Sequence, residues 1–339
     1  MADSRNFVRI EGYLKENTLE VKRNKDTHQE IISGALTIMI SADEEYRIWY
    51  YANRYKKLQP GEATPRENRI YEDLAKLLPD KTTSLAQVIQ ADPSATLENS
   101  KGTLTKIACT AKFEERFYKD RNGAVRTQYD VRGVSAFTAN KDFNPHSYYE
   151  IEGYVQSIKN ELDADQNETG RVIVDIVLLD FTGRAHKIPF VSGGADIAAV
   201  LADFELNSTY TLRGHLSRLV KRTTVVDNSA GSFGDKPREQ TVTQFIDERV
   251  ITGGNNIPLA GDKAISMDSI KSGMVARNEE IERVESQTSS AKTAAGSASS
   301  ATSTNAAATK SATKPNGSFG AASTTSEPLR RPSYEDVEF

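Results

Sequence analysis

A short sequence word occurs twice in this chain, the second time 141 residues after the first. Residues 10–13 (Ile-Glu-Gly-Tyr) recur as residues 151–154, and around both copies apolar residues alternate with polar ones. Such alternation is typical of a half-buried β-strand. The repeat therefore predicts two copies of one β-rich unit, each opening on an equivalent strand.

The segments that follow the two copies agree in their order. The first half predicts strands over 31–40, 46–53, 103–118 and 125–138, with a helix over 67–78. The second half predicts strands over 171–180, 184–192, 210–226 and 241–252, with a helix over 195–204. Asn122-Gly123 between two alternating strands is a strong hairpin signal. Each half thus has the order strand–strand–strand–helix–strand–strand, which is that of a five-stranded OB barrel.

We therefore predict an all-β fold with short helices, in which two tandem five-stranded OB-fold barrels precede a disordered C-terminal tail. The first barrel is expected over residues 1–143 and the second over 144–255. A flexible linker is expected over 256–326, with a marginal helix over 275–284 and disorder from about residue 286. Residues 286–326 are almost all small or polar, so they cannot bury enough surface to offset chain entropy.

Charged and aromatic residues return over 327–339. A featureless spacer that ends in such a segment suggests a tethered tip that binds partner proteins. The alternative is an ordinary solvated tail end.

The composition excludes several classes of protein. With one cysteine, Cys109, and four scattered histidines, the chain offers neither a disulfide scaffold nor a zinc site. No phosphate-binding loop or nucleophile motif is found, so we predict no catalytic residue, no metal, no cofactor and no enzymatic activity. There is no signal pattern and no apolar run that could span a bilayer, which predicts a cytoplasmic protein without membrane association. Lys and Arg number 43 against 47 Asp and Glu, so a nucleic-acid site would have to be a local basic groove.

An OB barrel binds oligonucleotides on one sheet face, where aromatic side chains stack on bases and cations follow the backbone. In the strand over 46–53, alternation assigns Tyr46, Ile48 and Tyr50 to the core. The opposite face and the residues after it combine aromatic and basic side chains and are our first binding candidates: Arg47, Trp49, Tyr51, Arg54, Tyr55 and Lys56. The alternative is that Trp49 is a core residue.

The hairpin over 103–138 adds a second group of candidates. Residues 101–134 contain eight basic and four acidic residues, although the whole chain is net negative. The binding candidates on this hairpin are Lys106, Lys112, Arg116, Tyr118, Arg126 and Arg132. In the second half we assign Arg213 and Arg218 to the same role, within a basic stretch that has few aromatic neighbours. The second barrel is therefore expected to serve in packing, oligomerisation or accessory DNA contact.

Together these features resemble a phage-encoded single-stranded DNA-binding protein with tandem OB domains. The end of the tail is similar to the acidic, Phe-terminated tip of bacterial single-stranded DNA-binding proteins, and its residues are Tyr334, Glu335, Asp336, Val337, Glu338 and Phe339. The likeness covers the tip by motif and residues 1–255 by layout. It departs from the bacterial pattern, which has more Asp residues and a Pro before the final Phe.

The resemblance implies sequence-nonspecific binding and protection of single-stranded DNA in a host bacterial cytoplasm. It further implies that the tip recruits replication, recombination and repair proteins, and it leaves homo-oligomer formation open. The competing hypothesis is an OB-fold structural or interaction module without such a role, either a virion or assembly protein or a binder of RNA or glycans.

Overall fold

The computed structural model describes residues 5–25, 27–56, 64–139, 143–163, 165–227 and 238–286, with the backbone alone over 219–227 and 238–246. The tail beyond residue 286, including the tip over 334–339, lies outside the described residues. The described part is mostly β-sheet with short helices, as predicted.

The first barrel is formed by five long strands and one short additional strand. Its strands are β1 (Asn6–Asn17), β2 (Glu20–Arg23), β3 (Glu30–Met39), β4 (Glu45–Asn53), β5 (Lys106–Lys119) and β6 (Val125–Thr138). β1 pairs with β3 and β5, β3 with β4, and β5 with β6, all antiparallel, while a parallel β4–β6 contact closes the barrel. The helical elements between β4 and β5 are α1 (Arg69–Ala75), η1 (Pro79–Lys81), α2 (Leu85–Ala91) and α3 (Leu97–Ser100).

The second barrel repeats this topology. Its elements are β7 (His146–Leu162), β8 (Glu168–Leu179), β9 (Ala185–Ser192), α4 (Ala195–Ala202), β10 (Thr209–Asp227) and β11 (Arg238–Gly254). β7 pairs with β8 and β10, β8 with β9, and β10 with β11, and a parallel β9–β11 contact closes this barrel. Both halves therefore have the strand order and the pairing of an OB barrel, which confirms the predicted fold class.

The repeated glycine of the two sequence words has a packing reason. A Cβ atom on Gly12 would lie 2.3 Å from the carbonyl oxygen of Met39, and one on Gly153 would lie 2.2 Å from a methyl carbon of Ile176. Each glycine thus permits the first strand of its barrel to pass close to the second. In the β5–β6 hairpin, Gly123 has a φ of +83°, which is the left-handed conformation that the predicted Asn-Gly turn requires.

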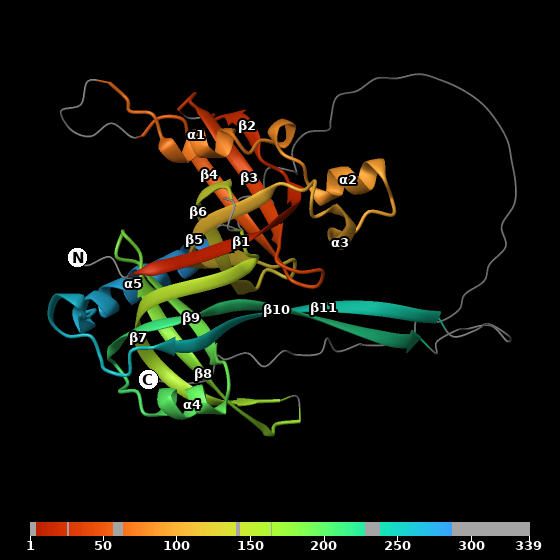
Figure 1. The fold of residues 1–339 in the computed structure, drawn as a ribbon. Coiled ribbons are helices and arrows are strands. Elements are labelled where there is room, and N and C mark those ends of the chain that lie inside the picture. The colour runs from red at the N-terminus through yellow and green to blue at the C-terminus, as the bar shows by residue number, and fades with distance from the viewer. Residues whose placement is uncertain are drawn as a thin grey trace, which may run out of the picture. The chain divides into compact units, whose positions relative to one another are not determined.

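The two barrels share one continuous sheet, which the sequence analysis did not predict. β1 and β7, the equivalent strands of the repeat, pair antiparallel from Asn6 opposite Ile151 to Glu11 opposite His146. The sheet therefore has 11 strands in the order β10-β11-β9-β8-β7-β1-β5-β6-β4-β3-β2. Figure 1 shows β1 and β7 next to each other where the barrels meet, and β10 and β11 continuing past the second barrel as a two-stranded ribbon.

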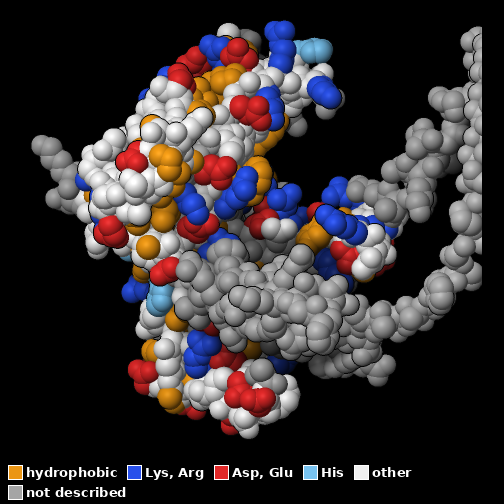
Figure 2. All heavy atoms as spheres, turned by 90° about the vertical axis from the view of Figure 1, so that its right-hand side faces the viewer, with side chains coloured by type: hydrophobic (Ala, Val, Ile, Leu, Met, Phe, Trp, Pro, Cys, Tyr) orange, Lys and Arg blue, Asp and Glu red, His pale blue; other side chains and the backbone are white. Residues whose placement is uncertain are grey.

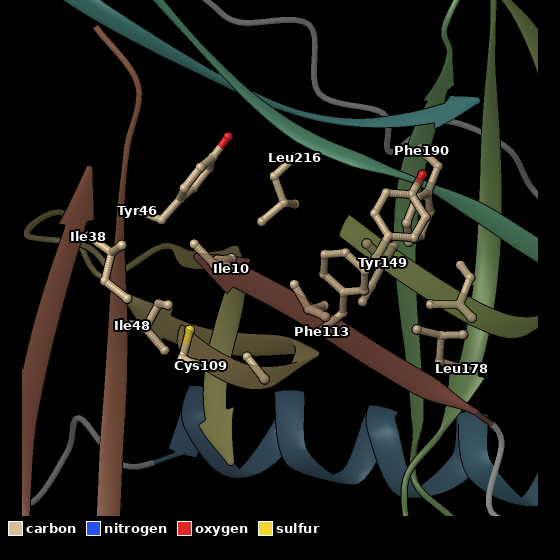
Figure 3. Close-up of a cluster of buried hydrophobic side chains, with 14 of the residues drawn as sticks. Ile10, Ile38, Tyr46, Ile48, Cys109, Phe113, Tyr149, Leu178, Phe190 and Leu216 are labelled. Atoms are coloured by element: carbon tan, nitrogen blue, oxygen red, sulfur yellow. The ribbon is translucent and has the colours of Figure 1, made fainter. Parts of the chain in front are cut away.

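Three aromatic rings pack where the two barrels meet. Phe113 of β5 lies 5.4 Å from Tyr149 of β7 and 5.3 Å from Phe190 of β9, measured between ring centroids. All three side chains are at most 2% exposed, and Figure 3 shows them beside the aliphatic core of the first barrel. The cores of the two barrels are therefore continuous.

A C-terminal helix, α5 (Met267–Ser286), follows the short η2 (Gly261–Lys263) and packs against β5, β6, β8 and β9. From the sequence, a flexible linker with a marginal helix over 275–284 was predicted here. Ile270, Gly273, Met274 and Arg277 fall on one face of α5, and Ile270 and Met274 join the core cluster that contains Ile265. This stripe has only two large apolar residues, so its amphipathic pattern is weak in the sequence.

Arg277, the last of those four residues on α5, forms a buried ion pair. Its Nε and Nη2 donate to the carboxylate of Glu115 on β5 at 2.8 and 2.7 Å, and Glu115 is 1% exposed. The backbone N–H of Lys187 on β9 also donates to this carboxylate, at 3.1 Å. Glu115 therefore links α5 and both barrels at one point.

His186 lies beside this ion pair. Its Nδ1 accepts a hydrogen bond from the backbone N–H of Glu115 at 3.1 Å, and its Nε2 lies 3.3 Å from Asp180. Burial, and after it the nearby Arg184 guanidinium, lowers the pKa of His186 below its usual value. The neutral imidazole that Nδ1 needs as an acceptor is therefore favoured.

Candidate nucleic-acid interface

A cleft with a volume of about 770 Å³ opens on the first barrel. β2 and β3 supply one wall, β4 lies along the middle, and β5 and β6 supply the other wall. Its lining residues are Thr18, Glu20, Lys22, Ser33, Gly34, Arg47, Trp49, Tyr50, Tyr51, Glu114, Arg116, Asp130, Val131 and Arg132.

Strand alternation places the aromatic candidates in this cleft. Trp49 and Tyr51 are each 48% exposed, whereas Tyr46, Ile48 and Tyr50 between them are buried. Trp49 is thus not a core residue, because the apolar requirement of the barrel is met by its neighbours on the opposite face. Two large rings thus lie two residues apart on the same strand face, each about half exposed.

Both rings are held in position by polar neighbours. The guanidinium of Arg47 lies over the Trp49 ring, 4.9 Å from its centroid, a cation–π geometry. The hydroxyl of Tyr51 accepts a hydrogen bond from Asn24 Nδ2 at 3.0 Å. Asn24 follows β2, so the β2–β3 hairpin fixes the free end of the Tyr51 ring.

Most cations of the cleft are paired with carboxylates. Arg132 lies 3.2 Å from Glu114, Arg116 lies 3.5 Å from Asp130, and Lys22 pairs with Glu20. Among the residues that the structure describes, Arg47 is the lining cation without such an ion pair. The four lining cations therefore face three lining carboxylates, and the cleft is only slightly positive. Figure 2 shows Lys and Arg side chains interspersed with Asp, Glu and hydrophobic side chains.

The other candidates of the first barrel extend away from the cleft. Arg54 pairs with Glu30 at 2.5 Å and lies over the Tyr55 ring, beyond the end of β4 with Lys56. On the hairpin, Lys112 is opposite Arg132, and Tyr118 is opposite Arg126 near the turn. Tyr118 is 47% exposed, and Arg126 pairs with Asp120 at 2.8 Å. Tyr118 and Arg126 lie on the same hairpin face as Glu114 and Arg116, and so extend the lining face toward the turn.

Three candidates lie elsewhere. Lys106 lies over the Phe143 ring, at the start of β5. Arg213 pairs with Glu150 in the second barrel at 2.8 Å. Arg218 donates to the backbone carbonyl of Glu45 at 3.0 Å and pairs with Asp247, and thus lies between the barrels. The structure does not bring these three together with Trp49.

The equivalent strand face of the second barrel has a different character. Arg171 is bound by both Glu161 and Glu248, and Lys187 lies 3.5 Å from Asp175. In the described part of this barrel, the aromatic side chain more than one-third exposed is Phe181, in the turn after β8. Among its described side chains, this face therefore offers ion pairs rather than exposed aromatic rings.

Neither the carboxylates of the cleft nor its β2 wall were predicted from the sequence. Glu114 and Asp130 contributed there only to the local charge, and Glu20 and Lys22 lie on a short strand that was not predicted. The alternation of residues 112–118 and 126–132 would have placed Glu114 and Asp130 on the same face as Arg116 and Arg132.

Within the described ranges, no group of His, Cys, Asp and Glu side chains is arranged to hold a metal ion. No helix in that part of the chain has the length and hydrophobicity needed to cross a membrane.

Comparison with solved structures finds single-stranded DNA-binding proteins at low similarity. The wild-type protein from Thermus aquaticus is 12% identical, with a TM-score of 0.42 over 79% of this chain and 99% of that chain. A deletion mutant of it has a TM-score of 0.39 at 12% identity, covering 77% and 98% of the two chains. A replication protein A heterotrimer bound to ssDNA has a TM-score of 0.18 at 10% identity, over 84% and 70%. The OB assignment rests on the strand pairing of this chain itself.

No curated protein matches the chain. A family profile does match, over residues 4–287, which include both barrels and α5. That match covers most of the chain, and the protein belongs to the YorF family.

Proposed function

We propose that this protein binds single-stranded DNA without sequence preference, in the cleft of its first barrel, and so protects it. The observation that carries the proposal is the pair Trp49 and Tyr51, half exposed on one strand face beside Arg47. Base stacking on aromatic rings contributes ~1–3 kcal/mol per base and tolerates any sequence. Duplex DNA keeps its bases stacked inside the helix, so this surface favours a single strand.

The cations supply the second part of the chemistry. Arg47 is placed to contact a phosphate next to a base on Trp49, and Arg116 and Arg132 can do so if they leave their carboxylates. Lys112, Tyr118 and Arg126 extend the path along the β5–β6 hairpin. Arg213 and Arg218 have a supporting role: they either make an accessory contact to the DNA from the second barrel or serve in packing.

Titration of a dT30 oligonucleotide into the full chain tests the proposal. Trp49 is the single tryptophan, so its fluorescence should change on binding, and the affinity should fall with salt. One phosphate contact gives a slope of about −0.7 in log K against log salt concentration, and contacts from all four lining cations give about −2.8. Absence of binding at low salt would refute the proposal, and a slope near zero would remove the phosphate contacts from it. Parallel titration with U30 measures the preference for DNA over RNA.

The proposal also assigns partner recruitment to the tip, residues 334–339, on the basis of its sequence alone. Deletion of residues 327–339 is expected to abolish capture of replication or recombination proteins and to leave dT30 affinity unchanged or slightly higher, because an acidic segment competes with DNA. A large loss of dT30 affinity in this variant would contradict the assignment.

A further inference from the structure

Two carboxylates lie inside a cleft that is proposed to bind a polyanion. Glu114 and Asp130 face each other across the β5–β6 pair and line the cleft below Arg132 and Arg116. Their side chains are each 18% exposed, whereas those of Arg132 and Arg116 are 58% and 60% exposed. A phosphate that entered the cleft would meet these fixed negative charges together with the arginines.

The carboxylates are anchored and the arginines are not. Asp130 also accepts a hydrogen bond from Gln128 Nε2 at 2.7 Å, on its own strand. Glu114 also lies 3.7 Å from Arg184 of the second barrel, whose side chain is 19% exposed. Among the described residues, Arg116 and Arg132 each pair with one carboxylate only, and their long, exposed side chains can swing outward. Incoming DNA can therefore draw the arginines away but cannot move the carboxylates.

We propose that Glu114 and Asp130 are selectivity residues that keep phosphates out of the cleft floor, so that the cleft accepts bases and rejects bare polyanions. A single strand can place its bases against Trp49 and Tyr51 and its phosphates at the rim, near Arg47 and the outward arginines. A duplex or an inorganic polyphosphate has only phosphates to place in the cleft, and there the carboxylates repel them. This inference rests on the proposed function and specifies which part of the DNA enters the site.

The double variant E114Q/D130N removes both charges and keeps the side-chain shapes. Arg184 retains Glu280 and Asp180 as ion-pair partners, so Glu114→Gln does not leave this arginine without a carboxylate. From the usual strength of exposed ion pairs, the variant should bind inorganic polyphosphate and a 30-base-pair duplex roughly 2- to 30-fold more tightly than the original protein. The dT30 affinity should rise by a smaller factor than the polyphosphate affinity, because the freed arginines attract its phosphates at the rim while the bases that enter the cleft floor carry no charge. The salt slope for duplex binding should steepen by about 1.8 if both arginines are freed.

The matched control is E98Q/D73N, which removes one glutamate on α3 and one aspartate on α1, each paired with the lysine that follows its helix and outside the cleft lining. Polyphosphate and duplex binding are measured directly by calorimetry, and dT30 binding by anisotropy. Equal gains for dT30 and polyphosphate, no gain for polyphosphate, or the same gain in the control would each overturn the inference. If the original protein fails to bind dT30, the proposed function fails by itself, while the calorimetry still reports whether the carboxylates repel polyphosphate.

Discussion

Replacement of Trp49 with alanine is expected to weaken binding of a fluorescein-labelled dT30 by about 5- to 150-fold, because one stacked base contributes ~1–3 kcal/mol. Trp49 is 48% exposed and lies outside the barrel core, so thermal stability should change little. The measurement is fluorescence anisotropy at low salt, with the unfolding midpoint recorded for each variant.

Two further variants identify the cause of the loss. W49F keeps an aromatic face and should recover part of the affinity. F181A removes another exposed aromatic ring, 84% exposed in the turn after β8, and should leave binding unchanged. A loss below twofold in W49A, or an equal loss in F181A, would show that Trp49 does not stack on the DNA.

Replacement of Arg277 with alanine is expected to lower the free energy of unfolding by about 3–5 kcal/mol, because it leaves the Glu115 carboxylate buried without its cation. Arg277 donates two hydrogen bonds to Glu115, which is 1% exposed. The pair joins α5 to β5 where the two barrels meet, so the whole described unit should lose stability. Urea unfolding followed by circular dichroism measures the change.

Arg283→Ala on the same helix is the control. Its side chain is 65% exposed and pairs with Glu280, so its loss should cost at most about 1 kcal/mol. The double variant R277M/E115Q removes both charges and should be more stable than R277A, since no carboxylate is then buried alone. Equal effects of R277A and R283A would mean that the ion pair does not stabilise the fold.

Local patterns were sufficient to predict most of the fold. The alternation of apolar and polar residues located the ten long strands and showed which residues of β4 would be buried, because strand faces follow from a period of two. The strand order in each half then predicted an OB barrel. The structure contains the parallel strand contacts that close each barrel, β4 with β6 and β9 with β11. The position of Arg47, Trp49 and Tyr51 on one strand face followed from the same period.

Long-range contacts could not be predicted in this way. The pairing of β1 with β7 joins residues about 140 positions apart. Nothing in the sequence of either strand indicates which strand it pairs with. The packing face of α5 was not predicted because two of its four positions are Gly273 and Arg277, which are not apolar. Arg277 packs there only because Glu115 on β5 accepts its hydrogen bonds. Strand alternation places Glu114 and Asp130 on the same face as Arg116 and Arg132. The ion pairs between them were nevertheless not predicted, because they form across two strands.

The sequence by itself determined the two barrels, their strand faces and the cluster of rings and cations on β4, since these depend on neighbours within a few residues. The tertiary structure decided that Trp49 and Tyr51 face an open cleft, that three carboxylates share it, and that α5 and a continuous sheet join the barrels. Those features depend on side chains from strands far apart in the chain, and such side chains meet only when the barrels have closed.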